Sequence, residues 1–471
     1  MMHYPLDQST LVRLLGIPSD RLLNALKGLV ERGLVRVPKT GHFMPGIPDL
    51  SPWLEENFTH QERHQIACSL LRMVQHQQPQ ELPKQDLPIR ARLLAMSHER
   101  RPFLAAIDEH VDELRRAGFY HIAVGFYRYA NELLTAETIG LPAARLEYML
   151  SRAELALELS MLEECRQSIG PITALSETMR NERGSVRSLL LQGQMAMHQD
   201  DLDEAREWFK RAIDGARALA DPDLLARSMV AMAGWFERYG DNLAGQRQLE
   251  GAMNLYHRWG TRRMDMYSRA QMINRAVNMW CNRGMYTRAV NLVEDLRRMA
   301  QISGLPTLDC RVEWAQARIQ AARGDSEHAR RMIAQATEFA KQHRLNALHM
   351  ELIRQHASIA LDANDYEGSL GLLNELLFLS DRFGDQYSHQ RALDMRAFAQ
   401  TMLHIDTSES LAQLKQILAR AEQRRVPKDI YRCHNFLQRA YTHLGKVALA
   451  REHENGARFI AQRMRYHHSA A

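Results

Sequence analysis

Residues 189–216 read LLLQGQMAMHQDDLDEAREWFKRAIDGA, a stretch with the pattern of two helices packed together across a tight turn. Gly193 has no side chain, so one helix can cross the next closely there, and Asp200 and Asp201 are turn-forming residues. After the turn, residues at i, i+4 and i+7 form one face of the second helix: Ala205, Phe209 and Ala212. The stretch therefore predicts a helical hairpin.

The same pattern recurs along the chain at intervals of 40 to 44 residues. With the turn residue of the first copy, Asp200, as the origin, the offsets recur at eight further turns: Gly118, Ser160, Gly240, Gly284, Gly324, Asn364, Ile405 and Gly445. A fixed period of this length indicates a repeat array. The order of small residue, turn, Ala, large residue and Ala resembles the tetratricopeptide repeat (TPR). This resemblance implies an all-α, right-handed solenoid of about nine helical hairpins over residues 101–471.

Composition is consistent with a soluble protein that buries a continuous core, since 45% of the 471 residues are hydrophobic and 25% are charged. The formal net charge is +5, with 53 Arg and only 8 Lys, a skew that does not by itself indicate nucleic-acid binding. The five cysteines have no zinc-site spacing, which predicts buried thiols in a reducing cytoplasm: Cys68, Cys165, Cys281, Cys310 and Cys433. No run of eighteen apolar residues occurs, so we expect a cytoplasmic protein without a membrane span.

The first 48 residues have the element order of a winged helix. Residues 9–16 and 21–32 are predicted helices, and residues 34–45 alternate apolar and polar around Thr40-Gly41, as in a β-hairpin. In a DNA-binding version, the second helix and the wing would supply the contacts: Arg21, Asn24, Lys27, Arg36 and Lys39. Asp20 and Glu31 on the same surface weaken the attraction for phosphate, which favours a packing or linking role for this module.

Residues 49–100 are predicted to form a helical linker, with a helix at 59–75 and a polar, proline-bearing hinge at 77–88. The order of winged helix, linker helix and forty-residue repeats resembles the region downstream of the nucleotide-binding domain in bacterial signal-transduction ATPases, such as the maltose-regulator-like transcription activators. The resemblance rests on the repeat anchors and on these residues: Leu11, Leu14-Leu15-Gly16, Leu22-Leu23, Leu26, Leu29-Val30, Arg32-Gly33-Leu34 and Glu62-Arg63.

The chain departs from that family because no phosphate-binding loop occurs, and Gly445-Lys446 is followed by Val447 in a repeat turn. The chain is then either a reduced relative that acts through partners or one piece of a split system.

The TPR resemblance also implies which residues of the first helices face a concave groove. The groove candidates are Arg227, Asn274, Asn278, Asn282, Arg311, Trp314, Arg318 and Arg354. The three asparagines are spaced i, i+4 and i+8, so their carboxamides form a ladder that suits an extended peptide backbone, while guanidinium groups suit carboxylates. The alternative is a solvated polar face without a ligand.

Motifs of enzymes are absent from the sequence: there is no HExxH pair, nucleophile elbow, dinucleotide loop or paired-carboxylate motif. We therefore expect no catalytic residues, no cofactor and no metal site. The favoured hypothesis is a regulatory protein whose solenoid binds a peptide or protein segment, with the N-terminal module coupling it to transcription or to a partner. The alternative is a TPR scaffold or assembly chaperone with no DNA-binding role.

Overall fold

The structure is a computed structural model, and it describes residues 100–116, 118, 120–136, 142–259 and 266–464, three short strands, and positions 21, 23, 24 and 27. Two compact units divide the chain, residues 1–137 and residues 138–471, which we call the N-terminal unit and the solenoid unit. The sequence-based division into 1–48, 49–100 and 101–471 stays a prediction. The predicted helices at 9–16 and 59–75 and the hinge at 77–88 lie outside the described residues.

The N-terminal unit contains a three-stranded antiparallel sheet in the order β1-β3-β2. Strands β2 (Val35–Lys39) and β3 (His42–Pro45) form the hairpin predicted for this segment, and β1 (Leu6–Asp7) pairs with the other edge of β3. Arg21, Asn24 and Lys27 are exposed helical positions, and Arg36 and Lys39 lie in β2. The winged-helix assignment and the DNA contacts stay predictions. Helices α6 (Arg100–Arg116) and α7 (Tyr120–Ala136) form the first helical hairpin in this unit.

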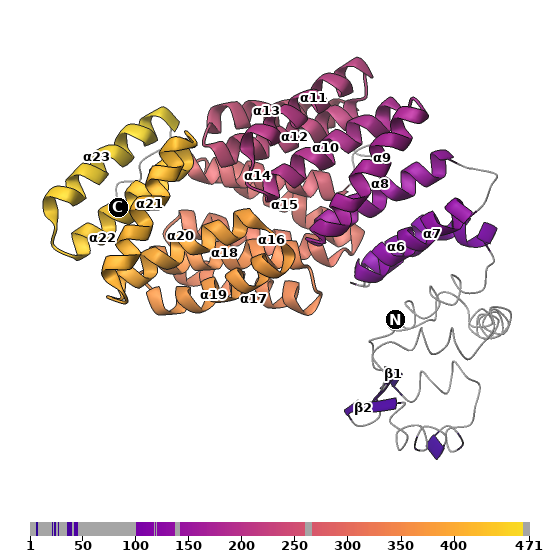
Figure 1. Ribbon diagram of the computed structural model, residues 1–471, viewed down its shortest axis with the longest axis horizontal. Coiled ribbons are helices and arrows are strands. Elements are labelled where there is room, and N and C mark those ends of the chain that lie inside the picture. The colour runs from indigo at the N-terminus through magenta and orange to yellow at the C-terminus, as the bar shows by residue number, and fades with distance from the viewer. Residues whose placement is uncertain are drawn as a thin grey trace. The chain divides into compact units, whose positions relative to one another are not determined.

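The solenoid unit continues with sixteen helices in eight hairpins among its described residues (Figure 1). The bounds are α8 Pro142–Glu158, α9 Leu162–Thr178, α10 Glu182–His198, α11 Leu202–Ala218, α12 Pro222–Tyr239, α13 Asn242–Trp259, α14 Met266–Asn282, α15 Tyr286–Ser303, α16 Pro306–Ala322, α17 Ser326–Gln342, α18 Asn346–Asp362, α19 Tyr366–Phe383, α20 Gln386–Met402, α21 Thr407–Gln423, α22 Pro427–His443 and α23 Val447–Met464. With α6 and α7, the described chain has the nine hairpins that the sequence predicts. None of the described helices is long and apolar enough to span a membrane.

The helices end where one residue takes the left-handed backbone conformation. Asp200 has φ 62° and Gly240 has φ 106°. This conformation is easiest for Gly, which has no Cβ, and for Asn and Asp, whose short polar side chains can hydrogen-bond locally. Asp201 then begins the next helix, since its side chain accepts a hydrogen bond from the backbone N–H of Glu204. In the eighth hairpin the left-handed residues after α20 are His404 and Asp406, one on each side of the predicted Ile405.

Close helix crossing at Gly193 confirms the predicted register of the hairpin. A Cβ atom added at Gly193 would lie 2.4 Å from Cε1 of Phe209 on the second helix. Ala205, Phe209 and Ala212 are all buried in the same apolar cluster. The small residues therefore let the backbones approach, and the large ring fills the space between them.

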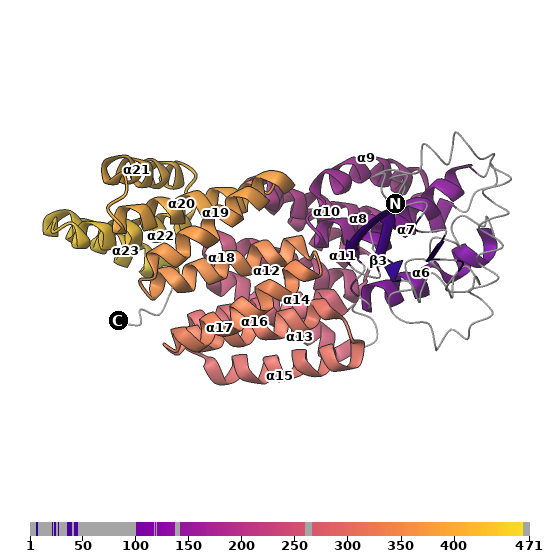
Figure 2. The same cartoon turned by 90° about the horizontal axis from the view of Figure 1, so that it is seen from below.

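First helices lie on the inside of the solenoid unit. Neighbouring first helices such as α12 and α14, or α14 and α16, contact one another, and α8, α10 and α12 also contact α18, α20 and α22, respectively. The last three pairs each join hairpins that are five repeats apart, so one superhelical turn contacts the next. Figure 2 shows α12, α14, α16 and α18 in the middle of the unit, with α15 and α21 at its outer edges. The side chains of the first helices therefore form the inner surface.

Candidate ligand-binding surface of the solenoid

Three predicted groove residues come together on α14 and α16. Arg318 donates from Nε to Oδ1 of Asn278 (2.8 Å) and from Nη2 to Oδ1 of Asn282 (2.5 Å). Asn278 donates to the carboxylate of Glu237 on α12, which also accepts from Nη1 of Arg275 at 3.3 Å. We call these five residues the amide network. It joins three successive first helices and is half-buried, so it lies within reach of solvent.

Two further predicted residues are buried one helical turn before the network. Asn274 on α14 is 3% exposed, and neither its Nδ2 nor its Oδ1 has a hydrogen-bond partner. Trp314 occupies the equivalent position on α16, is 6% exposed, and leaves its indole N–H without an acceptor. Arg311 lies half-buried one turn before Trp314. Buried polar groups are nearly always satisfied by protein, water or ligand, so this face has unused hydrogen-bonding capacity.

Arg227 belongs to a separate ion-pair cluster with Arg187 and Glu154. The Glu154 carboxylate accepts from Nη2 of Arg227 at 2.9 Å and from Nε and Nη2 of Arg187 at 2.9 and 3.0 Å. Burial alone would raise the pKa of Glu154, but the two guanidinium groups lower it to about 2. Sequence reasoning missed Glu154, although it precedes its turn by the same six residues as Asn278 and Arg318.

Glu154→Gln is expected to destabilise the fold by roughly 2–3 kcal/mol at pH 7, because a pKa lowered on folding stabilises the native state. The stabilisation is complete above the unfolded pKa, near 4.5, and is lost as the pH falls toward 2. Urea unfolding at pH 7 and pH 3 should therefore show a difference between variant and parent that shrinks in acid. Glu147→Gln is the matched control, because the Glu147 side chain is 60% exposed and its ion pair with Arg187 contributes little. An equal loss at both pH values would contradict this interpretation.

Arg354 lies in a third group, around the ring of Tyr387 on α20. The guanidinium carbons of Arg238, Arg391 and Arg354 lie 3.1, 5.1 and 5.8 Å from the ring centre. Burial alone would raise the pKa of Tyr387, but Arg354, Arg238, Arg391 and Lys428 together lower it. We call these five residues the Tyr387 cluster. Arg354 is a groove candidate from the sequence, but the cluster as a whole could not be predicted, because its members come from four helices on different turns of the superhelix.

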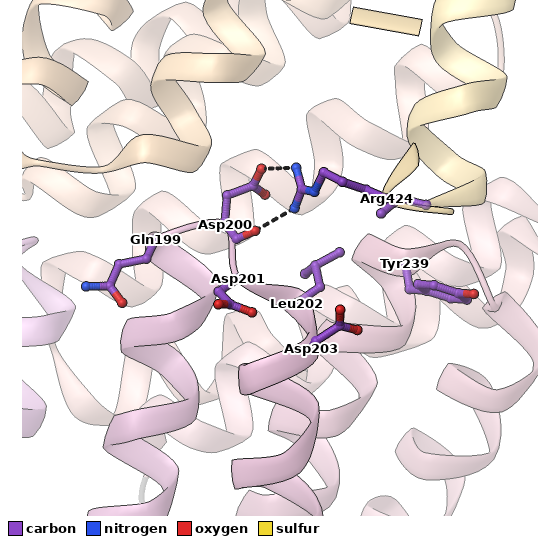
Figure 3. A pocket seen from close by; sticks show the side chains of 8 residues that line it. Gln199, Asp200, Asp201, Leu202, Asp203, Tyr239 and Arg424 are labelled. Carbon is purple, nitrogen blue, oxygen red and sulfur yellow. Dashed lines mark hydrogen bonds and ion pairs between the residues drawn. The ribbon is translucent and has the colours of Figure 1, made fainter. Parts of the chain in front are cut away.

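Successive superhelical turns contact one another at a seam. There the loop between α10 and α11 meets α20 and the loop between α21 and α22. Asp200 accepts hydrogen bonds from Arg238 and Arg424, and His198 Nδ1 lies 3.2 Å from Asp385 Oδ2. Figure 3 shows the carboxylate of Asp200 facing Arg424. A cavity of about 320 Å³ lies beside these two residues. The cavity is lined by Gln199, Asp200, Asp201, Leu202, Asp203, Tyr239, Arg424 and Val426. Asp200 therefore links segments more than two hundred residues apart in the chain.

Metal-binding groups of three or more His, Cys, Asp or Glu side chains are not found among the described residues. Four cysteines, Cys165, Cys281, Cys310 and Cys433, are free thiols and buried, as predicted, and Cys68 lies outside the described residues. Burial raises the pKa of Cys165 and Cys310 to about 12, so these thiols are poor nucleophiles.

No protein-family model matches the chain, and no curated protein matches it in sequence. Among solved structures, a Rap protein in complex with Competence and Sporulation Factor superposes with a TM-score of 0.56, at 12% identity, covering 78% of this chain and 99% of its own. The fold is therefore that of a TPR-like helical-repeat solenoid. The Rap conjugation gene regulator of a plasmid, in complex with a Phr peptide, matches with a TM-score of 0.49 at 13% identity over 78% of this chain and 96% of its own.

A signal-transduction ATPase with a tetratricopeptide-repeat sensor, from Pyrococcus horikoshii, has a TM-score of 0.38 at 11% identity. It covers 95% of this chain, and this chain covers 60% of its length. At such identities the likeness concerns the fold alone, and the assignment of the TPR-like fold rests on the first Rap structure.

Proposed function

We propose that this chain is a non-enzymatic regulatory protein that binds a peptide or protein segment on the inner surface of α12, α14 and α16. The observation that carries the proposal is the buried carboxamide of Asn274, which has no partner beside the half-buried amide network. The Rap protein of similar fold is in complex with Competence and Sporulation Factor, which supports a ligand-binding role for this kind of solenoid.

Chemically, a carboxamide supplies one acceptor and two donors, which match the C=O and N–H of an extended peptide backbone. Asn274 and the indole N–H of Trp314 are unused donors on adjacent helices, and Asn278, Asn282 and Arg318 lie one to two turns further along. A ligand backbone would pair with the unused groups of Asn274 and Trp314. It would replace some of the internal hydrogen bonds of the amide network with hydrogen bonds to the ligand. Such exchange costs little, because each broken internal bond is replaced by one to the ligand.

Coupling to transcription is the further part of the proposal and rests on the N-terminal module. The winged-helix-like segment 1–48 would contact a partner, or DNA through the exposed Arg21, Asn24 and Lys27. A scaffold or assembly chaperone with no DNA-binding role is the alternative in which the same inner surface binds a protein segment.

Asn274→Leu separates the ligand-binding role of this residue from a structural one. Leu has a branched side chain of similar shape but larger volume, and no polar atoms. Removal of an unsatisfied buried amide and the better helix propensity of Leu offset the tighter packing, so the melting temperature is expected to stay constant or rise. Enrichment of peptides from a phage-displayed library of random linear sequences should fall at least tenfold relative to the parent protein. If the variant loses stability and keeps peptide binding, Asn274 is structural and the proposal is wrong.

A second variant, Asn278→Ala with Arg318→Ala, tests the amide network. Both partners of one hydrogen bond are removed together, and the remaining Glu237 and Asn282 are half-buried and can bind water, so the melting temperature should change little. Binding of the selected peptides should weaken tenfold or more. Arg331→Ala, an exposed arginine on the outer helix α17, is the control that should bind like the parent.

A further inference from the structure

The Tyr387 cluster gathers four cations from four first helices on the inner surface. Arg238 comes from the end of α12, Arg354 from α18, Arg391 from α20 and Lys428 from the start of α22. The guanidinium carbons of the cluster's three arginines lie 3.1 to 5.8 Å from the centre of the Tyr387 ring. Like charges repel at such distances, so an arrangement of this kind needs anions to hold it together.

Carboxylates among the described residues do not fully neutralise these cations. Asp200 is shared by Arg238 and Arg424, and Asp394 and Asp429 are shared by Arg391 and Arg432. Arg354 pairs with Glu351, whose side chain is 46% exposed, and Lys428 bonds only to the backbone carbonyl of Glu237. Four carboxylates thus pair with five cations, and Lys428 has no carboxylate partner in the part of the chain that the structure describes. Two further acids nearby are engaged elsewhere: Asp385 is hydrogen-bonded to His198 and Ser388, and Glu237 to Arg275 and Asn278.

Unused donors point to the same excess of positive charge. Arg238 is 8% exposed and Arg391 is 5% exposed, and each has a buried Nε–H without an acceptor. The side chain of Arg354 is 22% exposed, so a ligand can reach the cluster from the inner surface. The lowered pKa of the Tyr387 phenol, which burial would raise, agrees with a positive potential at this point.

We infer that the Tyr387 cluster is a binding site for an anionic group, a carboxylate or a phosphate, reached through Arg354. Its guanidinium groups can donate paired hydrogen bonds to either group. Glu237 belongs to the amide network and precedes Arg238 of the cluster in α12, and its carbonyl holds Lys428. A peptide bound along the amide network would therefore place an acidic side chain, or the carboxylate of the peptide's C-terminus, at this site. This last step rests on the proposed function.

Titration with inorganic phosphate and with acetate, at constant ionic strength set by chloride, tests the anion site without any peptide. Phosphate, acetate or both should raise the melting temperature of the parent protein in a saturable manner. Arg354→Gln should lose at least half of the shift, and Arg354→Gln with Lys428→Met should lose nearly all of it. Arg331→Gln, on an outer helix, should keep the full shift. Equal shifts in the parent and in both Arg354 variants would overturn the inference.

The peptide arm compares free and amidated C-termini of the sequences selected on the parent protein. If the site takes a terminal carboxylate, amidation should weaken binding about tenfold in the parent and hardly at all in Arg354→Gln. If it takes an acidic side chain, replacing Asp or Glu in the peptide should give that pattern instead. Failure to select any peptide, with saturable phosphate binding intact, would refute the proposed function and leave the anion site standing.

Discussion

Ala205→Arg is expected to unfold the third hairpin or to lower the free energy of unfolding by more than about 4 kcal/mol. Ala205 is fully buried in α11, in one cluster with Phe209 and Ala212, where the first and second helices touch. An arginine there would overpack the contact and would bury a charge without a partner, and each effect alone is strongly destabilising. Ala329→Arg in α17 should behave in the same way, because Ala329 is equally buried at the equivalent repeat position.

Matched controls lie on the same two helices. Ala218 on α11 and Ala334 on α17 are exposed, so Ala218→Arg and Ala334→Arg add the same group to the same helix in contact with water. Surface substitutions of this kind usually change the free energy of unfolding by no more than about 0.5 kcal/mol. Thermal and urea unfolding followed by circular dichroism should therefore separate the two pairs clearly. Parent-like melting of Ala205→Arg would mean that the repeat register is wrong.

The hairpins could be predicted from the sequence because their determinants are local. Gly193, Ala205 and Phe209 lie within one repeat, and their spacing encodes the crossing of the two helices inside that hairpin. The exact turn residue is harder to predict from the sequence. In the eighth hairpin, for example, His404 takes the left-handed conformation one residue before the predicted Ile405. The short strand β1 escaped prediction because two residues carry no periodic pattern.

The inner surface was predictable only in part. Asn278, Asn282 and Arg318 lie at offsets that the TPR resemblance implies, and the structure brings them together in one network. Tyr387 and Lys428 had no such signal, because their neighbours depend on how tightly the superhelix coils. That pitch is set by the sum of many small rotations between repeats, which no single motif encodes.

Asp200→Asn is the second substitution with a large expected effect, and it tests the seam that closes the superhelix. The Asp200 carboxylate accepts from Arg238, which is 8% exposed, and from Arg424, whose side chain is 31% exposed. Asparagine tolerates the left-handed backbone at this turn, so the change removes the charge with little backbone strain. It leaves the guanidinium of Arg238 buried beside other cations, and a loss of about 3–5 kcal/mol is expected.

A double-mutant cycle with Arg424→Ala distinguishes a charge effect at the seam from a local effect on the α10–α11 turn. Arg424→Ala alone should cost about 1 kcal/mol or less, because Arg424 is partly exposed and Asp200 keeps Arg238. In the double variant the loss should be smaller than the sum of the two single losses, because Asp200→Asn already removes the carboxylate that Arg424 binds. Arg238 lowers the pKa of Asp200, against the effect of burial, so the effect of Asp200→Asn should also shrink as the pH falls below the ordinary aspartate range. Strictly additive losses that do not change with pH would show that the turn, and not the contact between superhelical turns, determines the stability.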